Sequence, residues 1–152
     1  QPMTTQTAYA SAHAVGLAGQ IATTDPTNID SKTNASATAI AFGTLVDYGT
    51  GDNECVPHAA TGKPVGIAII DPTLPALNAD TYKRYDSVNI LRRGVVWVTV
   101  GAAVEEGDPV YYVDATGVWT NVAGGGANIR LGSAVYESAA ANAALAKIRV
   151  EL

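Results

Sequence analysis

The sequence predicts an all-β protein with a single compact antiparallel β domain, either a barrel or a sandwich, that follows an extended N-terminal arm. Short runs of alternating apolar residues begin at residue 36, and clusters of turn-forming residues then recur about every 8–12 positions. The length supports one domain, because 152 residues suffice for one core and rarely for two. We therefore divide the chain into an arm, residues 1–35, and a β domain, residues 36–152.

The arm is distinguished by apolar residues that are few and separated by small ones. A helix over residues 8–22 is disfavoured, because Gly16 and Gly19 would each cost about 1 kcal/mol relative to Ala there. The segment has too little apolar surface to fold alone, so we expect it to become ordered on a partner. Because the strand pattern starts after it, removal of residues 1–34 is expected to leave a folded domain. The arm residues expected to contact a partner are Tyr9, Val15, Leu17, Gln20 and Ile21.

Three short strands are expected before a long loop. The first run ends in a turn cluster, residues 47–52, and the third stops at Asp71-Pro72. Residues 73–85 contain Pro75 and little periodicity, which predicts a loop. The three runs cover residues 37–46, 55–56 and 65–70.

A β-branched run at residues 95–100 is the strongest strand signal in the chain. Its apolar residues occupy both faces, which predicts a central strand buried on both sides, with Trp97 in the core. Residues 86–91 form the strand before it, and Arg92-Arg93-Gly94 is predicted to be a tight corner between the two.

Four more strand signals follow. Residues 114–117 predict a hairpin between strands 110–113 and 118–120, and Trp119 after this turn is interpreted as facing outward or into a subunit contact. Gly132 predicts a bulge within residues 129–136. Residues 137–146 are interpreted as a loop, with a short helical turn as the alternative, and residues 147–152 alternate as in a half-buried antiparallel strand.

Composition disfavours two classes of partner. The net charge is −5 and the nine Lys and Arg residues are scattered, whereas binding of nucleic acid needs clustered cations. No apolar run approaches the roughly 20 residues of a membrane-spanning helix. We therefore expect neither nucleic acid nor membrane as a partner.

Candidate chemical sites in the sequence are incomplete. Cys55 and His58 have the spacing of half a metal site, but no second pair of ligands accompanies them. The acidic residues 47–54 do not follow the EF-hand order and are interpreted as a solvated turn. Residues 124–126 lack the Lys-Ser/Thr that completes a phosphate-binding loop. The sequence therefore predicts no enzyme, no catalytic residue, no cofactor and no metal.

Two stretches carry a family resemblance. Residues 16–22, Gly-Leu-Ala-Gly-Gln-Ile-Ala, lead to Ala-Ile-Ala-Phe-Gly at residues 39–43. Residues 88–97 end in Trp97 and precede Val-x-x-Gly-Asp-Pro-Val-Tyr at residues 104–111. In this order and spacing the set resembles the structural cement, or capsid decoration, proteins of tailed bacteriophages, over about residues 15–152.

The resemblance implies a β-tulip-like domain and a homotrimer on the outer surface of the virion capsid, which binds the major capsid protein and stabilises contacts between its subunits. The arm residues would then contact the capsid or a neighbouring subunit. The alternative is a virion-surface module that binds glycans or the host. A trimeric β-fold hydrolase is a third class, for which the sequence supplies no base or metal set.

Overall fold

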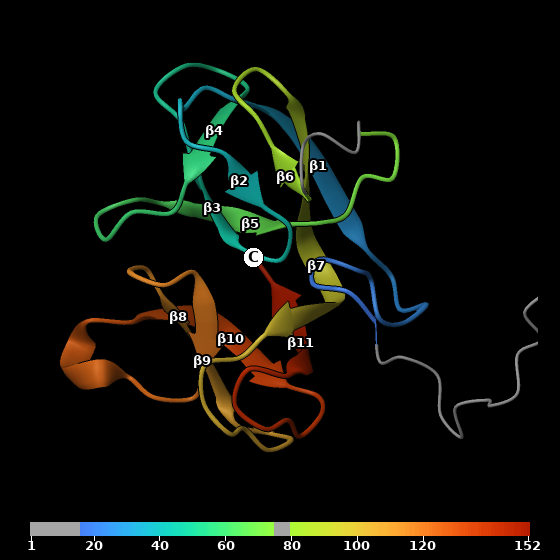
Figure 1. Ribbon diagram of the computed structural model, residues 1–152, viewed down its shortest axis with the longest axis vertical. Coiled ribbons are helices and arrows are strands. Elements are labelled where there is room, and N and C mark those ends of the chain that lie inside the picture. Colours follow the sequence, from blue (N-terminus) through green and yellow to red (C-terminus); the bar gives the residue numbers. More distant parts are fainter. Residues whose placement is uncertain (1–15, 75–79) are drawn as a thin grey trace, which may run out of the picture.

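The computed structural model describes residues 16–74 and 80–152, and this part of the chain is all-β, as predicted. Among these residues there is no α-helix, and no helix is long and apolar enough to cross a membrane. Tyr9 and Val15 lie outside the described residues. The elements, labelled in Figure 1, are β1 (Asn28–Asn34), β2 (Ile40–Ala41), β3 (Leu45–Tyr48), β4 (Glu54–Pro57), β5 (Pro64–Ala68), β6 (Thr81–Tyr82), β7 (Ser87–Thr99), β8 (Pro109–Val113), β9 (Val118–Thr120), a 3₁₀ turn (Gly124–Gly126), β10 (Ile129–Tyr136) and β11 (Leu145–Glu151).

The strands form two rings that share β7. The first ring runs β1-β4-β3-β5-β7 and closes because β1 also pairs with β7. The second runs β7-β11-β10-β8-β9 and is closed by a bridge between Val100 and Trp119. In Figure 1 the rings are the upper and lower halves of the molecule, and β7 passes from one to the other. The strand pairings are antiparallel except that of β1 with β4, and the closing bridge of Val100 with Trp119 is also parallel. Of the two predicted architectures, barrel and sandwich, the closed rings agree with the barrel.

The long strand β7 corrects the predicted corner at Arg92-Arg93-Gly94. The strand continues through these residues, pairing with β1 and β5 in its first half and with β11 in its second. Gly94 has φ +138°, a left-handed value suited to glycine, and a register shift against β1 lies beside it. The glycine therefore marks a bend within one strand and not the end of a strand.

The first strand corrects the predicted start of the strand pattern. β1 begins at Asn28, inside the range assigned to the arm, and pairs with β7 over Asn28–Thr33. Its last residue, Asn34, is fully buried, and its Nδ2 donates to the carbonyls of Thr38 (3.1 Å) and Tyr82 (3.2 Å). The signal was weak because β1 is polar, and its stability comes from pairing and buried hydrogen bonds. The short β6 lies in the predicted loop for a similar reason: its two residues show no periodicity.

The structure corrects the predicted positions of both tryptophans, Trp97 in the core and Trp119 facing outward or into a subunit contact. Trp119 is fully buried between the rings, its Nε1 donates to the Gly43 carbonyl at 2.7 Å, and its ring lies 4.8 Å from that of Tyr112. Trp97 is only half-buried, because Val96 and Val98 take the inward positions of β7. The β-branched run is central as predicted, but Trp97 lies on its outer face.

The core lies partly within the first ring and partly between the rings. Val46, Cys55, Val88 and Ile90 pack inside the first ring. Leu45, Ile67 and Leu91 come from first-ring strands but pack with the apolar residues of the second ring. The predicted bulge at Gly132 (φ +52°) and the alternation of β11, with Ile148 and Val150 buried, are confirmed. The predicted loop over residues 137–146 is confirmed for residues 137–144, which form no helix, but its last two residues belong to β11, which begins at Leu145.

Two buried tyrosines predict a loss of stability in alkali. Burial is the main cause that raises the pKa of Tyr82 and of Tyr112 from 10.0 to about 12. A phenol with a raised pKa stabilises the fold below its unfolded pKa, and that contribution is lost as the pH rises through the folded pKa. We therefore expect the melting temperature to fall steeply between about pH 10 and 12, as measured by circular dichroism.

The matched variant is Tyr82→Phe. It removes the hydrogen bond from the Tyr82 hydroxyl to the Ile69 carbonyl, so its melting temperature at neutral pH should be lower. It also removes one titrating group, so the further fall in alkali should be smaller than in the wild type. An equal fall in both proteins would contradict the assignment.

Candidate functional site

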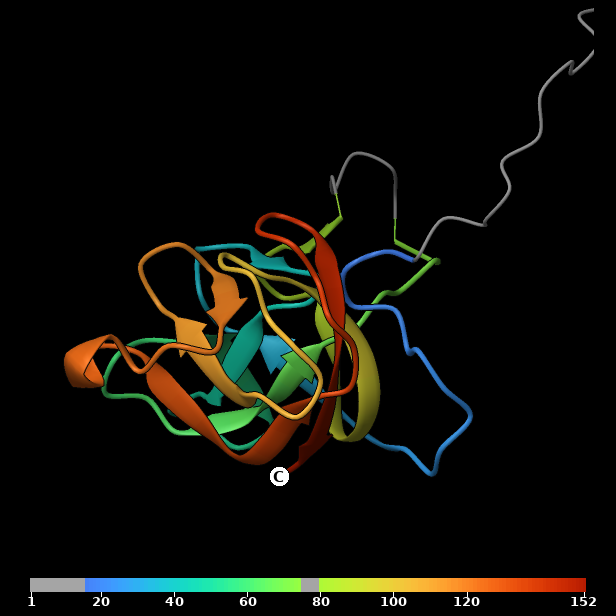
Figure 2. The ribbon, with the colours of Figure 1, turned by 90° about the horizontal axis from the view of Figure 1, so that it is seen from below.

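Leu17, Gln20 and Ile21, the predicted contact residues that the structure describes, belong to one segment beside β7. We call residues 16–22 the arm root. Figure 2 shows this segment running along the outer side of β7. Because the arm root follows directly from residues 1–15, it fixes the point at which they join the domain.

Main-chain hydrogen bonds hold the arm root against β7. The Gly19 amide donates to the Trp97 carbonyl (2.8 Å), the Trp97 amide donates to the Gln20 carbonyl (2.9 Å), and the Ala22 amide donates to the Val95 carbonyl (2.8 Å). Ile21 forms an antiparallel bridge with Val96 and packs against the core cluster between the rings. The arm root is therefore an added strand-like segment whose backbone position does not depend on a partner.

The two glycines of the arm root allow close approach to the domain. A Cβ atom at Gly16 would lie 2.8 Å from Cδ1 of Trp97, so the backbone there lies directly against the indole. Gly19 (φ +84°) lies against Gly43, where a Cβ would be 3.0 Å from the amide nitrogen. Trp97 also has the Lys147 ammonium 5.6 Å from its ring centroid. In the sequence, Gly16 and Gly19 disfavour a helix. In the structure, they allow the backbone of the arm root to contact Trp97 and Gly43.

Leu17 and Gln20 are the exposed residues of the arm root. Leu17 is 66% exposed at a tight turn in which the Gln20 amide donates to the Leu17 carbonyl (3.0 Å). The Oε1 atom of Gln20 in turn accepts the Leu17 amide at 3.1 Å. Gln20 therefore fixes the turn, while the Leu17 side chain is left free for a contact outside the chain.

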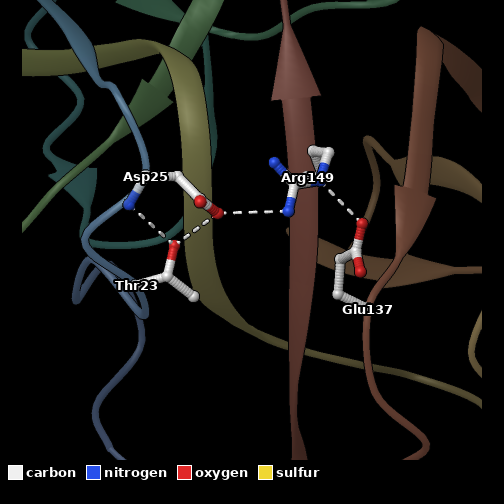
Figure 3. Close-up of polar contacts among 4 residues, drawn as sticks. All are labelled: Thr23, Asp25, Glu137 and Arg149. Carbon is white, nitrogen blue, oxygen red and sulfur yellow. Dashed lines mark hydrogen bonds and ion pairs between the residues drawn. The ribbon is translucent and has the colours of Figure 1, made fainter.

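An ion-pair network fixes the chain just after the arm root (Figure 3). Arg149 donates from Nη2 to Asp25 (3.1 Å) and from Nε to Glu137 (2.7 Å), while the Thr23 hydroxyl donates to the same Asp25 oxygen (2.9 Å). The bonds from Thr23 and Arg149 lower the pKa of Asp25, and those to Glu137 and Asp25 raise the pKa of Arg149. The network is exposed to solvent, so its role is to hold position and its strength depends on salt.

Sequence reasoning missed this network. The alternation of residues 147–152 predicts only that Arg149 lies on the polar face of the last strand, and its partner Asp25 lies 124 residues earlier in the chain. No spacing rule connects two residues that far apart, so the pairing could be found only from the fold.

A family comparison covers nearly the whole chain, including the arm root. Residues 5–151 match the family model described as "Structural cement protein (E217 gp24/Pam3 gp6)". The chain belongs to this family of phage structural cement proteins. Its place is therefore in the capsid of a virion.

A solved structure shares the fold of this cement protein. A chain from the structure titled "The capsid of Myoviridae Phage XM1" aligns with 98% of this chain and 98% of its own length, at a TM-score of 0.73 and 20% identity. At that identity the likeness shows the fold alone. No curated protein sequence matches the cement protein.

The polar residues that the sequence offered for metal chemistry have structural roles in the cement protein. Nδ1 of His58 lies 2.7 Å from Oδ1 of Asp47, and both side chains are buried. The other oxygen of Asp47 accepts the Ala59 amide at 3.0 Å. Cys55 packs inside the first ring. Within residues 16–74 and 80–152, no three His, Cys, Asp or Glu residues form a group that could hold a metal ion.

This pair corrects the interpretation of Asp47 as part of a solvated turn. The carboxylate fills the space beside Gly62, where a Cβ would overlap Oδ2 of Asp47 at 1.6 Å. The pair thus ties β3 to the segment after β4.

Proposed function

We propose that this cement protein binds the outer surface of a tailed-phage head through its arm and stabilises contacts between major capsid subunits. Membership of the family supports the role as a cement protein. The proposal that the arm makes the contact is supported by the geometry of the arm root. The backbone is held by β7, while Leu17 is 66% exposed. A large apolar side chain on a fixed backbone binds a partner at a low cost in entropy.

The rest of the chain suits burial against other proteins. Charged residues make up 15% of the sequence, against about 25% in average proteins, so little charge has to leave water at an interface. In this proposal residues 1–15, with Tyr9 and Val15, extend the contact onto the capsid. The proposal includes a homotrimer, which rests on the resemblance alone.

The test uses heads purified from a phage that lacks the gene for this chain. We expect the added protein to cosediment with these heads, to saturate at a fixed ratio to capsid subunits, and to raise the temperature at which the heads disrupt. Sedimentation equilibrium of the free protein should give the mass of three chains. Failure to bind heads, together with binding to host cells or glycans, would favour the alternative surface module.

A matched pair of variants assigns the contact to the arm root. Leu17→Ser should weaken binding to heads by at least tenfold, about 1.4 kcal/mol, without lowering the melting temperature. Val122→Ser changes a side chain that is similarly exposed, at 55%, but lies in the loop after β9. Its binding should equal that of the wild type, and equal losses in both variants would contradict the role of Leu17.

A further inference from the structure

Two exposed tyrosines lie at one end of the first ring, each beside a cation. Tyr85 is 70% exposed, with the Arg84 guanidinium 4.8 Å from its ring centroid. Tyr48 is 44% exposed, with the Lys32 ammonium 5.3 Å from its ring centroid. We call these four residues the tyrosine end.

Strand pairing brings the two tyrosines to the same end. Tyr48 pairs with Cys55, Cys55 pairs with Asn34, and the Asn34 carbonyl accepts the Tyr85 amide at 2.8 Å. With neighbouring strands about 4.8 Å apart, the two residues are separated by roughly 10–15 Å. Figure 1 shows both turns, after β3 and after β6, at the upper end of the molecule, away from the arm root.

Tyr85 has a backbone conformation that tyrosine rarely adopts. Its φ is +71°, in the left-handed region where glycine and asparagine are common and a bulky residue is an outlier. The tight turn around it is held by other groups, since the Lys83 amide donates to Asp86 Oδ2 (2.7 Å) and the Asp86 amide donates to the Lys83 carbonyl (3.1 Å). The exposed ring adds little to folding, so this residue is better explained by a contact outside the chain.

The charge at this end is positive around Tyr85. Neither Lys83 nor Arg84 forms an ion pair within the described part of the chain. Lys32 has Asp30 at 3.9 Å. Two neighbouring carboxylates, Glu54 and Asp86, accept main-chain amides of Gly51 and Lys83. Asp52 is a further exposed carboxylate in the turn after β3, so the excess of positive charge is confined to Tyr85 and the exposed Lys83 and Arg84 before it. A partner that binds at Tyr85 therefore needs a carboxylate beside an apolar area.

We infer that the tyrosine end is a second protein-binding surface of the cement protein, and that its partner is a carboxylate-bearing part of the major capsid protein. Tyrosine and arginine are enriched among the residues that dominate binding energy at interfaces, and charge complementarity selects an acidic partner. The inference rests on the proposed function. With the arm root it makes attachment bivalent, so that each contact strengthens the other.

The test compares Tyr85→Asn with the wild type on heads that lack the cement protein. Asparagine accepts a positive φ, so the melting temperature should stay the same or rise, while the affinity for heads falls at least tenfold. Ala143→Gly is the matched control, because Ala143 also has a positive φ (+66°) and is exposed, but lies between β10 and β11. It should keep the affinity of the wild type. Arg84→Ala should lower the affinity and reduce its dependence on salt.

The outcomes separate this inference from the proposed function. Wild-type protein that does not bind heads overturns both. Wild-type protein that binds, with Tyr85→Asn binding equally well, overturns this inference alone. If Tyr85→Asn instead dissociates an oligomer of the free protein and leaves the affinity per chain for heads unchanged, the partner is a second copy of this chain, and the assignment to the capsid protein is wrong.

Discussion

Replacing Trp119 with alanine is expected to lower the free energy of unfolding by about 3–5 kcal/mol, a large part of the roughly 5–15 kcal/mol that stabilises a typical domain. The indole is fully buried between the two rings, contacts Tyr112, and donates its only hydrogen bond to the Gly43 carbonyl. The substitution would leave a cavity at the junction of the rings and a buried carbonyl without its donor.

Trp97→Ala is the comparison. Trp97 is half-buried, and its main-chain bonds to the arm root do not depend on the side chain. We expect a loss well below that of Trp119→Ala, measured by urea denaturation of both proteins under the same conditions. An equal or larger loss for Trp97→Ala would mean that the junction of the rings is not the main site of packing.

Two truncations are expected to differ sharply. Removal of residues 1–22 takes away the arm and its root but leaves every strand, so the protein should stay folded and lose its affinity for heads by orders of magnitude. Removal of residues 1–34 also takes away β1, which closes the first ring between β7 and β4. The cluster around Val88 and Ile90 would then be open to water, and we expect the second protein to be unfolded.

Circular dichroism and cosedimentation with heads separate these outcomes. A folded protein after the longer truncation would show that β1 is dispensable and that the domain begins after it. An undiminished affinity after the shorter truncation would show that the arm is not the main contact with the head.

The sequence predicted the fold class because the strands of the domain follow simple apolar patterns. Alternation in β11 and the β-branched run in β7 could be recognised without a structure. β1 was missed because its side chains are mostly polar, and it is held by backbone pairing and by the buried amide of Asn34. Local hydrophobicity contains no signal for such a strand.

The errors within the β domain have one common cause, which is contact between distant residues. Trp97 was placed in the core because its neighbours are apolar, but the face that it occupies depends on which side of β7 meets the other ring. The polar turn around Asp47 predicts an exposed carboxylate, but in the structure this carboxylate is buried against His58. In the arm root, the sequence indicated the segment and the structure supplied the anchoring bonds and the partner of Arg149.

The shared strand also determines how the protein bears mechanical load. The arm root is joined to β7 by antiparallel bonds at Val95 and Trp97, so a pull applied parallel to β7 would shear these bonds together. β7 passes the force sideways to β1 and β5 in one ring and to β11 in the other. We therefore expect such a load to be shared by both rings and not to fall on one hairpin.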